Sequence, residues 1–202
     1  MKHLLCIALL AGGSVFGADR KSDPFQKIKD QLASAPCISI GFVSILESDI
    51  FKSVDTTMGT AYFSRDGRYL VKLGDDMYLS DNHHRYSYTP ANNQVIIQKT
   101  DSSGSDAKEL FYITRLDEWY ETAILTPDKE YKLTRKPGSV GSLPDSLRVT
   151  IDKRKGRIAR ISYFDENDEP VSLVLLQESF PAACDDARFV PRFPDSVETV
   201  KM

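Results

Sequence analysis

Histidines and clustered carboxylates are the residues in this chain that could support metal binding or acid-base catalysis. His83 and His84 form the one adjacent histidine pair. Neighbouring side chains on a strand point to opposite faces, so such a pair is a poor chelate for zinc. Most Asp and Glu residues stand in turn sequences, where they favour turn geometry and solubility. The sequence therefore predicts an exposed turn at the histidine pair, and neither a bound metal nor another cofactor.

Nucleophile and phosphate-binding motifs give no support for an enzyme either. The chain contains no Gly-x-Ser-x-Gly elbow. Gly138 to Ser142 has loop composition, but no helix pattern follows it, so it does not fit a phosphate-binding loop. A thiol nucleophile also becomes unavailable if the two later cysteines are bonded to each other. We expect a protein without enzymatic activity.

The first residues have the three parts of a secretory signal peptide. A basic start with Lys2 precedes an apolar run from Leu4 to Ala11, and small residues follow. This run is too short to span about 30 Å of hydrocarbon. We expect cleavage after Gly17, which leaves a signal peptide (1–17) and one exported domain (18–202). No cysteine stands at the cleavage point for lipid attachment, so we expect a soluble periplasmic protein.

Two of the three cysteines, Cys37 and Cys184, lie beyond the predicted signal peptide. An even pair in an oxidising compartment favours a disulfide. The alternative is two separate buried thiols, because spacing alone does not show that the two residues meet. A bond would join the start of the fold to its end.

Composition is typical of a globular protein of one domain. Hydrophobic residues make up 41% and charged residues 27% of 202 residues, and the formal net charge is −3. This balance offers no basic surface to nucleic acid. Nucleic acid is therefore not an expected partner.

The hydrophobic periodicity predicts a helix followed by many short strands. Apolar residues at helical spacing indicate a helix from Pro24 to Ala33, ending before Pro36. Beyond it the period changes to two, with frequent turn signals, as in an antiparallel meander. A second helix is expected from Lys108 to Leu116. Expected strands cover 38–44, 58–64, 69–73, 77–80, 86–88, 94–99, 120–125, 131–135, 147–151, 158–164 and 171–177.

The last of these strands is apolar on both faces. Val171, Leu173 and Leu175 alternate with Val174 and Leu176. Both faces should therefore be covered. Such a sheet can pack helices on one face or enclose a cavity.

Several motifs follow one another along the chain in an order that can be compared with that of a known protein family. Phe42 in the first strand precedes Gly59 to Arg65, in which two aromatic residues, Tyr62 and Phe63, stand between a Gly and an Arg. A Tyr-x-Pro corner follows at Tyr88 to Pro90, and the chain closes with Asp186 to Val197, rich in Phe and Pro. In this order the chain resembles the LolA-type carriers of outer-membrane lipoproteins. It departs from them at Asp66, where the family usually has Pro.

The resemblance implies a mainly β fold with a few helices, in which an incomplete, curved antiparallel barrel has helices over its open, concave side. It also implies a monomeric periplasmic chaperone that shields lipoprotein acyl chains. An inner-membrane lipoprotein-releasing transporter and an outer-membrane acceptor would be its partners.

Two kinds of site residue follow from the resemblance. Arg65 would latch the lid segment from Lys108 to Leu116, or it is an ordinary strand-end charge beside Asp66. The hydrophobic lining would come from residues that are otherwise simply core: Phe63, Tyr69, Val71, Leu73, Tyr86, Tyr88, Leu147, Val149, Ile161, Leu173 and Leu175. A periplasmic module that senses lipids or lipoproteins, or a carrier of another hydrophobic ligand, remains an alternative function.

Overall fold

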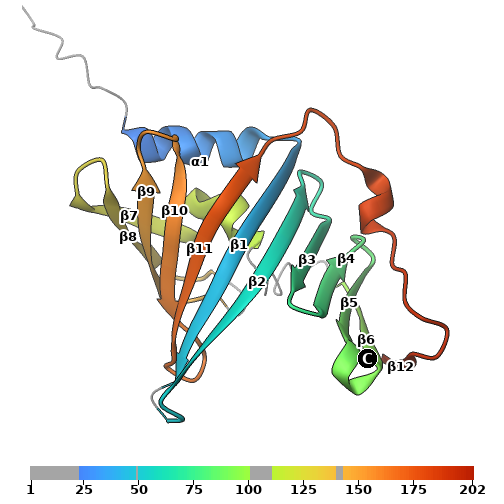
Figure 1. The fold of residues 1–202 in the computed structure, drawn as a ribbon. Coiled ribbons are helices and arrows are strands. Elements are labelled where there is room, and N and C mark those ends of the chain that lie inside the picture. Colours follow the sequence, from blue (N-terminus) through green and yellow to red (C-terminus); the bar gives the residue numbers. More distant parts are fainter. Residues whose placement is uncertain (1–22, 49, 101–110, 140–142) are drawn as a thin grey trace, which may run out of the picture.

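One open sheet contains every strand of the part of the chain that the structure describes (Figure 1). The computed structural model describes residues 23–48, 50–100, 111–139 and 143–202; the predicted signal peptide and residues 108–110 of the predicted second helix lie outside them. The strands are β1 (Cys37–Ser48), β2 (Ser53–Ser64), β3 (Tyr69–Leu73), β4 (Asp76–Ser80), β5 (His84–Thr89), β6 (Gln94–Lys99), β7 (Tyr120–Thr126), β8 (Glu130–Arg135), β9 (Ser146–Asp152), β10 (Arg157–Phe164), β11 (Pro170–Ser179) and β12 (Glu198–Lys201).

The strand order is β12-β6-β5-β4-β3-β2-β1-β11-β10-β9-β8-β7. Neighbouring strands pair antiparallel, except that β12 runs parallel to β6. The centre of the sheet is the long β1, which pairs with β2 on one side and with the distant β11 on the other. The two ends of the order do not pair with each other, so the curved sheet remains an incomplete barrel. The fold class expected from the sequence is confirmed.

The helix α1 (Pro24–Ser34) lies across the concave side of the sheet (Figure 1). Its start is set by Asp23, whose side chain accepts a hydrogen bond from the backbone N–H of Phe25, and by Pro24 in the first turn. Phe25, Ile28 and Leu32 form its buried stripe. We call the face of the sheet on which α1 packs the inner face.

The second covering segment is shorter than expected. A 3₁₀-helix, η2 (Phe111–Arg115), leads into a single turn, α2 (Leu116–Trp119), before β7 begins at Tyr120. Ile113 and Leu116 are buried with α1 in the main core of the inner face. The prediction that this segment is helical and covers the sheet is therefore confirmed. The predicted end at Leu116 is wrong, because α2 continues three residues further, to Trp119.

A C-terminal strap (residues 180–197) covers the other, outer face over β2 to β6. Phe189 is buried there with Leu70 and Leu79, and Phe193 packs at the edge of the same cluster. Figure 1 shows this red segment descending beside β3 and β4 to β12. A disulfide between Cys37 and Cys184, with Cα atoms 5.4 Å apart, fixes the strap to the first residue of β1. The predicted bond is present.

None of the helices in the described ranges is long and apolar enough to pass through a bilayer.

Candidate functional site

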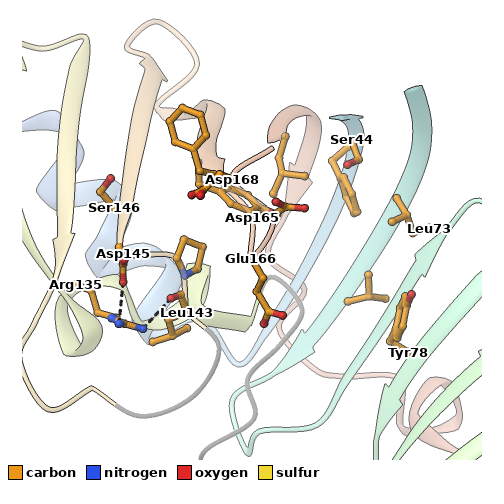
Figure 2. Close-up of a pocket in the computed structure, with 16 residues that line it drawn as sticks. Ser44, Leu73, Tyr78, Arg135, Leu143, Asp145, Ser146, Asp165, Glu166 and Asp168 are labelled. Carbon is orange, nitrogen blue, oxygen red and sulfur yellow. Dashed lines mark hydrogen bonds and ion pairs between the residues drawn. The ribbon is translucent and has the colours of Figure 1, made fainter. Parts of the chain in front are cut away.

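A cavity of about 600 Å³ lies on the inner face, between the centre of the sheet and its β8–β10 end (Figure 2). Figure 2 shows Ser44, Leu73 and Tyr78 on one side and Arg135 and Asp145 on the other. Its lining comes from β1, β3, β4, β10 and β11, from the end of β8 and the start of β9, and from two connecting segments. A volume of this size is within the range of about 300–1,000 Å³ typical of small-molecule pockets.

The sheet supplies an apolar floor. Phe42 of β1, Val71 of β3 and Leu173 of β11 all line the cavity. Each belongs to an alternating strand, so each shares its inner-face orientation with residues two positions away. Tyr78 and Tyr163 add aromatic surface from β4 and β10. This floor can bind an apolar ligand without desolvating charged groups.

One rim of the cavity is an acidic turn between β10 and β11. Asp165, Glu166 and Asp168 line the cavity there. The side chain of Asp165 accepts hydrogen bonds from the backbone N–H groups of Asn167 (2.8 Å) and Glu169 (2.9 Å), and so fixes the turn. The rim is thus polar and ordered, while the floor beneath it is apolar.

The opposite wall is held by Arg135. Its guanidinium donates to the carbonyl oxygen of Leu143 at 3.0 Å and forms an ion pair with Asp145 at 2.8 Å. The hydroxyl of Tyr120 donates to the carbonyl oxygen of Pro144 at 3.0 Å, and burial raises the pKa of this tyrosine, which keeps it a neutral donor. The wall is therefore coupled to α2, which directly precedes Tyr120.

The two covering segments are joined by a charged hydrogen bond. Lys29 of α1, which is only 7% exposed, donates to the carboxylate of Asp117 in α2 at 2.5 Å. Gln26 donates to the same carboxylate at 3.2 Å. Partial burial alone would raise the pKa of Asp117, but the hydrogen bonds from Lys29 and Gln26 and the positive charges of Lys29 and Lys136 together outweigh it and lower the pKa. We call this contact the lid clamp.

The structure divides the predicted lining residues among three places. Val71, Leu73 and Leu173 line the cavity. Tyr69, Leu147, Val149, Ile161 and Leu175 are buried in the inner-face core beside it. Phe63 is also buried in that core and reaches two smaller pockets instead.

Tyr86 and Tyr88 lie on the outer face, away from the cavity. Their rings are 5.9 and 5.5 Å from Phe193 of the strap. The hydroxyl of Tyr86 donates to Asp81 at 2.9 Å, and burial together with this bond raises the pKa of Tyr86 to about 12. An aromatic strand predicts an apolar neighbour but not which face it covers, and here the strap supplies the cover.

Arg65 lies beside the covering segments α1 and η2–α2, and its side chain forms no hydrogen bond or ion pair with their described residues. With Leu32, Thr114 and Glu118 it lines a pocket of about 250 Å³ between α1 and α2. Its side chain is exposed and, among the described residues, makes no hydrogen bond or ion pair; its backbone N–H donates to Pro36 at 3.0 Å. The structure brings Arg65 next to the lid, while its latch role stays a prediction.

Several lining residues were not expected from the sequence. Phe42 and Tyr163 could have been found, because they alternate with other inner-face residues. Arg135, Leu143 and Asp145 carry no such signal, since the fold of their loop brings them to the wall.

The described residues contain no group of three or more His, Cys, Asp or Glu placed to hold a metal ion. His83 is exposed in a turn, as expected, and His84 opens β5. Asp81 accepts hydrogen bonds from the backbone N–H groups of both histidines, so this carboxylate orders the turn.

Comparison with known proteins places the fold. No protein-family model and no curated protein sequence matches the chain. The solved structure of an uncharacterized conserved protein from Thermus thermophilus superposes with a TM-score of 0.53 and 12% identity, covering 88% of this chain and 99% of that chain. A LolA superfamily protein from Nitrosomonas europaea superposes with a TM-score of 0.47 and 10% identity, covering 83% of this chain and 96% of that chain. A DUF1329 family protein from Desulfovibrio piger superposes with a TM-score of 0.45 and 13% identity, covering 84% of this chain and 98% of that chain. The chain shares the fold of the Thermus protein, and its open, curved sheet with covering helices is the architecture expected from the sequence.

Proposed function

We propose that this protein is a periplasmic carrier that shields the acyl chains of lipoproteins in the inner-face cavity and delivers them to the outer membrane. The observation that carries the proposal is the cavity of about 600 Å³, with its apolar floor, beside two covering segments. The sequence resemblance supports the same role. An inner-membrane transporter would load the carrier, and an outer-membrane acceptor would unload it.

The physical need for such a cavity is simple. Each CH₂ group of an acyl chain that leaves water gains about 0.8 kcal/mol. Phe42, Val71 and Leu173 offer apolar surface to the acyl chain, while at the rim Glu166 is exposed and Asp165 is partly exposed to water. The acyl chain would lie on the floor and its polar head at the rim.

The resemblance implies a cover that moves during loading, so the contacts of the covering segments with the sheet must be breakable. The lid clamp between Lys29 and Asp117 joins α1 to α2, which would let the two segments move as one cover. Arg65, which lines the pocket beside α2, would form its latch bond in only one position of this cover.

Release of lipoproteins from inner-membrane vesicles into solution tests the proposal. We expect the mature protein to release them and to be recovered with lipoprotein bound, as seen by native mass spectrometry. Leu73→Gln, at the cavity, should reduce release at least severalfold. Met77→Gln, a half-buried residue of the outer-face cluster, is the matched control and should not.

Three results would contradict the proposal: no release by the mature protein, free lipid as its only bound species, or equal losses in the two variants. Recovery of free lipid would favour a sensor of lipids or a carrier of another hydrophobic ligand.

A further inference from the structure

Four large apolar side chains are exposed at one end of the sheet. Ile50 and Phe51, in the turn between β1 and β2, are 77% and 80% exposed. Val54 near the start of β2 and Phe164 at the end of β10 are each 64% exposed. Monomeric soluble proteins rarely gather large apolar side chains in this way unless the surface binds something. We call these four residues the apolar tip.

Strand register places the four residues at the same end. Val54 pairs with Glu47 of β1, and Phe164 pairs with Pro170 of β11. Because β1 and β11 are neighbours, both pairs lie where β1 leads into its turn. Figure 1 shows the β1–β2 hairpin extending past β3 to β6, with the β10–β11 turn close by. The apolar tip is thus a protrusion.

The apolar tip is joined to the rim of the cavity. The hydroxyl of Ser48 donates to the carboxylate of Glu169 at 2.5 Å, and accepts a hydrogen bond from the backbone N–H of Phe51 at 3.3 Å. Glu169 belongs to the turn whose Asp165 and Asp168 line the cavity. This bridge fixes the exposed aromatic residue relative to the cavity opening.

We propose that the apolar tip docks on the surface of a lipid bilayer with zwitterionic headgroups and brings the cavity rim to the membrane. Apolar side chains on a protrusion gain free energy by entering the interface between headgroups and acyl chains. A protrusion that ends in two adjacent apolar side chains fits this deformable surface.

Charge selects the type of membrane. Glu47 is paired with Val54, and Glu166, Asp168 and Glu169 lie in the turn that follows Phe164, while Lys52 is the one basic residue of the β1–β2 turn. Anionic headgroups would be repelled by these carboxylates, whereas zwitterionic headgroups would not. The docking does not depend on the cargo, so it can be tested with empty protein.

Vesicle flotation tests the docking directly. We expect the mature, cargo-free protein to float with phosphatidylcholine vesicles and to float less with vesicles rich in phosphatidylglycerol. The double variant Ile50→Ser, Phe51→Ser should lower the partition coefficient roughly tenfold or more, since two side chains lose their burial. Met58→Ser is the matched control, because Met58 is 68% exposed but lies in the middle of β2. It should keep partition within about twofold of the original protein.

Tryptophan fluorescence tests whether the apolar tip inserts into the bilayer. The emission of Phe51→Trp should shift to the blue when vesicles are added, while that of Met58→Trp should not. Equal circular dichroism and thermal midpoints establish that the variants are folded. Three outcomes would overturn the proposal: no flotation of the original protein, unchanged flotation of the double variant, or an equal loss in Met58→Ser. Binding of the tip to a protein partner would give the first of these. A lipid bound only in the cavity would leave the protein at the bottom of the gradient.

Discussion

The ring of Phe42 lies against Gly59, its cross-strand partner on β2, so closely that no side chain fits between them. A Cβ atom added at Gly59 would lie 2.4 Å from Cζ of Phe42. Glycine is therefore required there by the ring and not by its backbone conformation. Phe42 lines the cavity, so its packing against Gly59 positions part of the cavity floor.

Replacing Gly59 should deform this floor. In Gly59→Val the new side chain would displace the Phe42 ring from its present position. Overpacking of this kind lowers the free energy of unfolding by about 1–3 kcal/mol. We expect a lower thermal midpoint and weaker binding of a fluorescent fatty acid. Gly41→Ala is the matched control, since an added Cβ there meets only the flexible Gln177 side chain at 3.0 Å. Equal effects of the two substitutions would argue against the role of the ring.

The lid clamp should contribute to stability in a way that depends on pH. Removing one partner with Asp117→Asn would leave Lys29 buried with a weaker acceptor, at a cost of about 1–2 kcal/mol. Glu118→Gln, which breaks only the exposed pair with Arg115, should cost less than about 0.5 kcal/mol. Amide hydrogen exchange in α2 should become faster in the first variant only.

Low pH should destabilise the protein in the same way as Asp117→Asn, because it protonates the Asp117 carboxylate of the lid clamp. The folded pKa of Asp117 is lowered, so its contribution is present above the unfolded value of 3.8 and is lost as pH falls through the folded pKa. The difference in unfolding free energy between the original protein and Asp117→Asn should therefore shrink below about pH 4. A constant difference down to pH 2 would contradict this account.

Glu178 should destabilise the fold as pH rises towards neutral. Burial raises the pKa of this half-buried carboxyl from 4.5 to about 7, although Arg157 opposes the shift, and Oε1 has no hydrogen-bond partner among the described residues. A raised folded pKa gives stability below the unfolded pKa that is lost as pH rises through the folded one. The thermal midpoint should fall between pH 4.5 and 8 in the original protein and fall less in Glu178→Gln. The exposed Glu121→Gln should follow the original protein.

Reduction of the disulfide should loosen the C-terminal strap. Cys37 and Cys184 are 147 positions apart, and on the chain-entropy model so long a loop stabilises the fold by about 4–5 kcal/mol. We expect Cys184→Ser to lower the unfolding free energy in urea by up to this amount. Under denaturing conditions the unreduced mature protein should show no reactive thiol. Two reactive thiols per chain would mean that the bond is not formed.

Substitution of Arg65 distinguishes a role as lid latch from that of an ordinary surface charge. Its side chain is exposed, so Arg65→Leu should change the unfolding free energy by less than about 0.5 kcal/mol. If the latch proposal holds, the variant should retain bound lipoprotein when an acceptor membrane is added. Lys72→Leu, an exposed residue of β3, should release its cargo normally. Normal release by Arg65→Leu would remove this residue from the mechanism.

Alternation along the strands was enough to predict most of the sheet and part of the site. Val71 and Leu73 share one face of their strand because they alternate with Leu70 and Lys72, and the structure has both at the cavity. The short strand β12 was not predicted, because four residues with one half-buried side chain carry little periodic signal. Its pairing depends on the edge of β6 being free to receive it.

Tyr86 and Tyr88 show where the reasoning from sequence stopped. A strand pattern tells which residues share a face, but the face that encloses a ligand depends on what covers each side. Only the fold showed that the strap covers these tyrosines and that α1 covers the inner face. The same limit applies to Arg135, whose partners Leu143 and Asp145 come from a loop.

The sequence by itself determined the alternating strands, the first helix and the cysteine pair, because each depends on local residue types and their spacing. The tertiary structure alone decided that a cavity stays open beneath Phe42, that Lys29 meets Asp117, and that Ile50 and Phe51 protrude. These depend on contacts between residues far apart in the chain, which are set by how the sheet curves and which segments cover it.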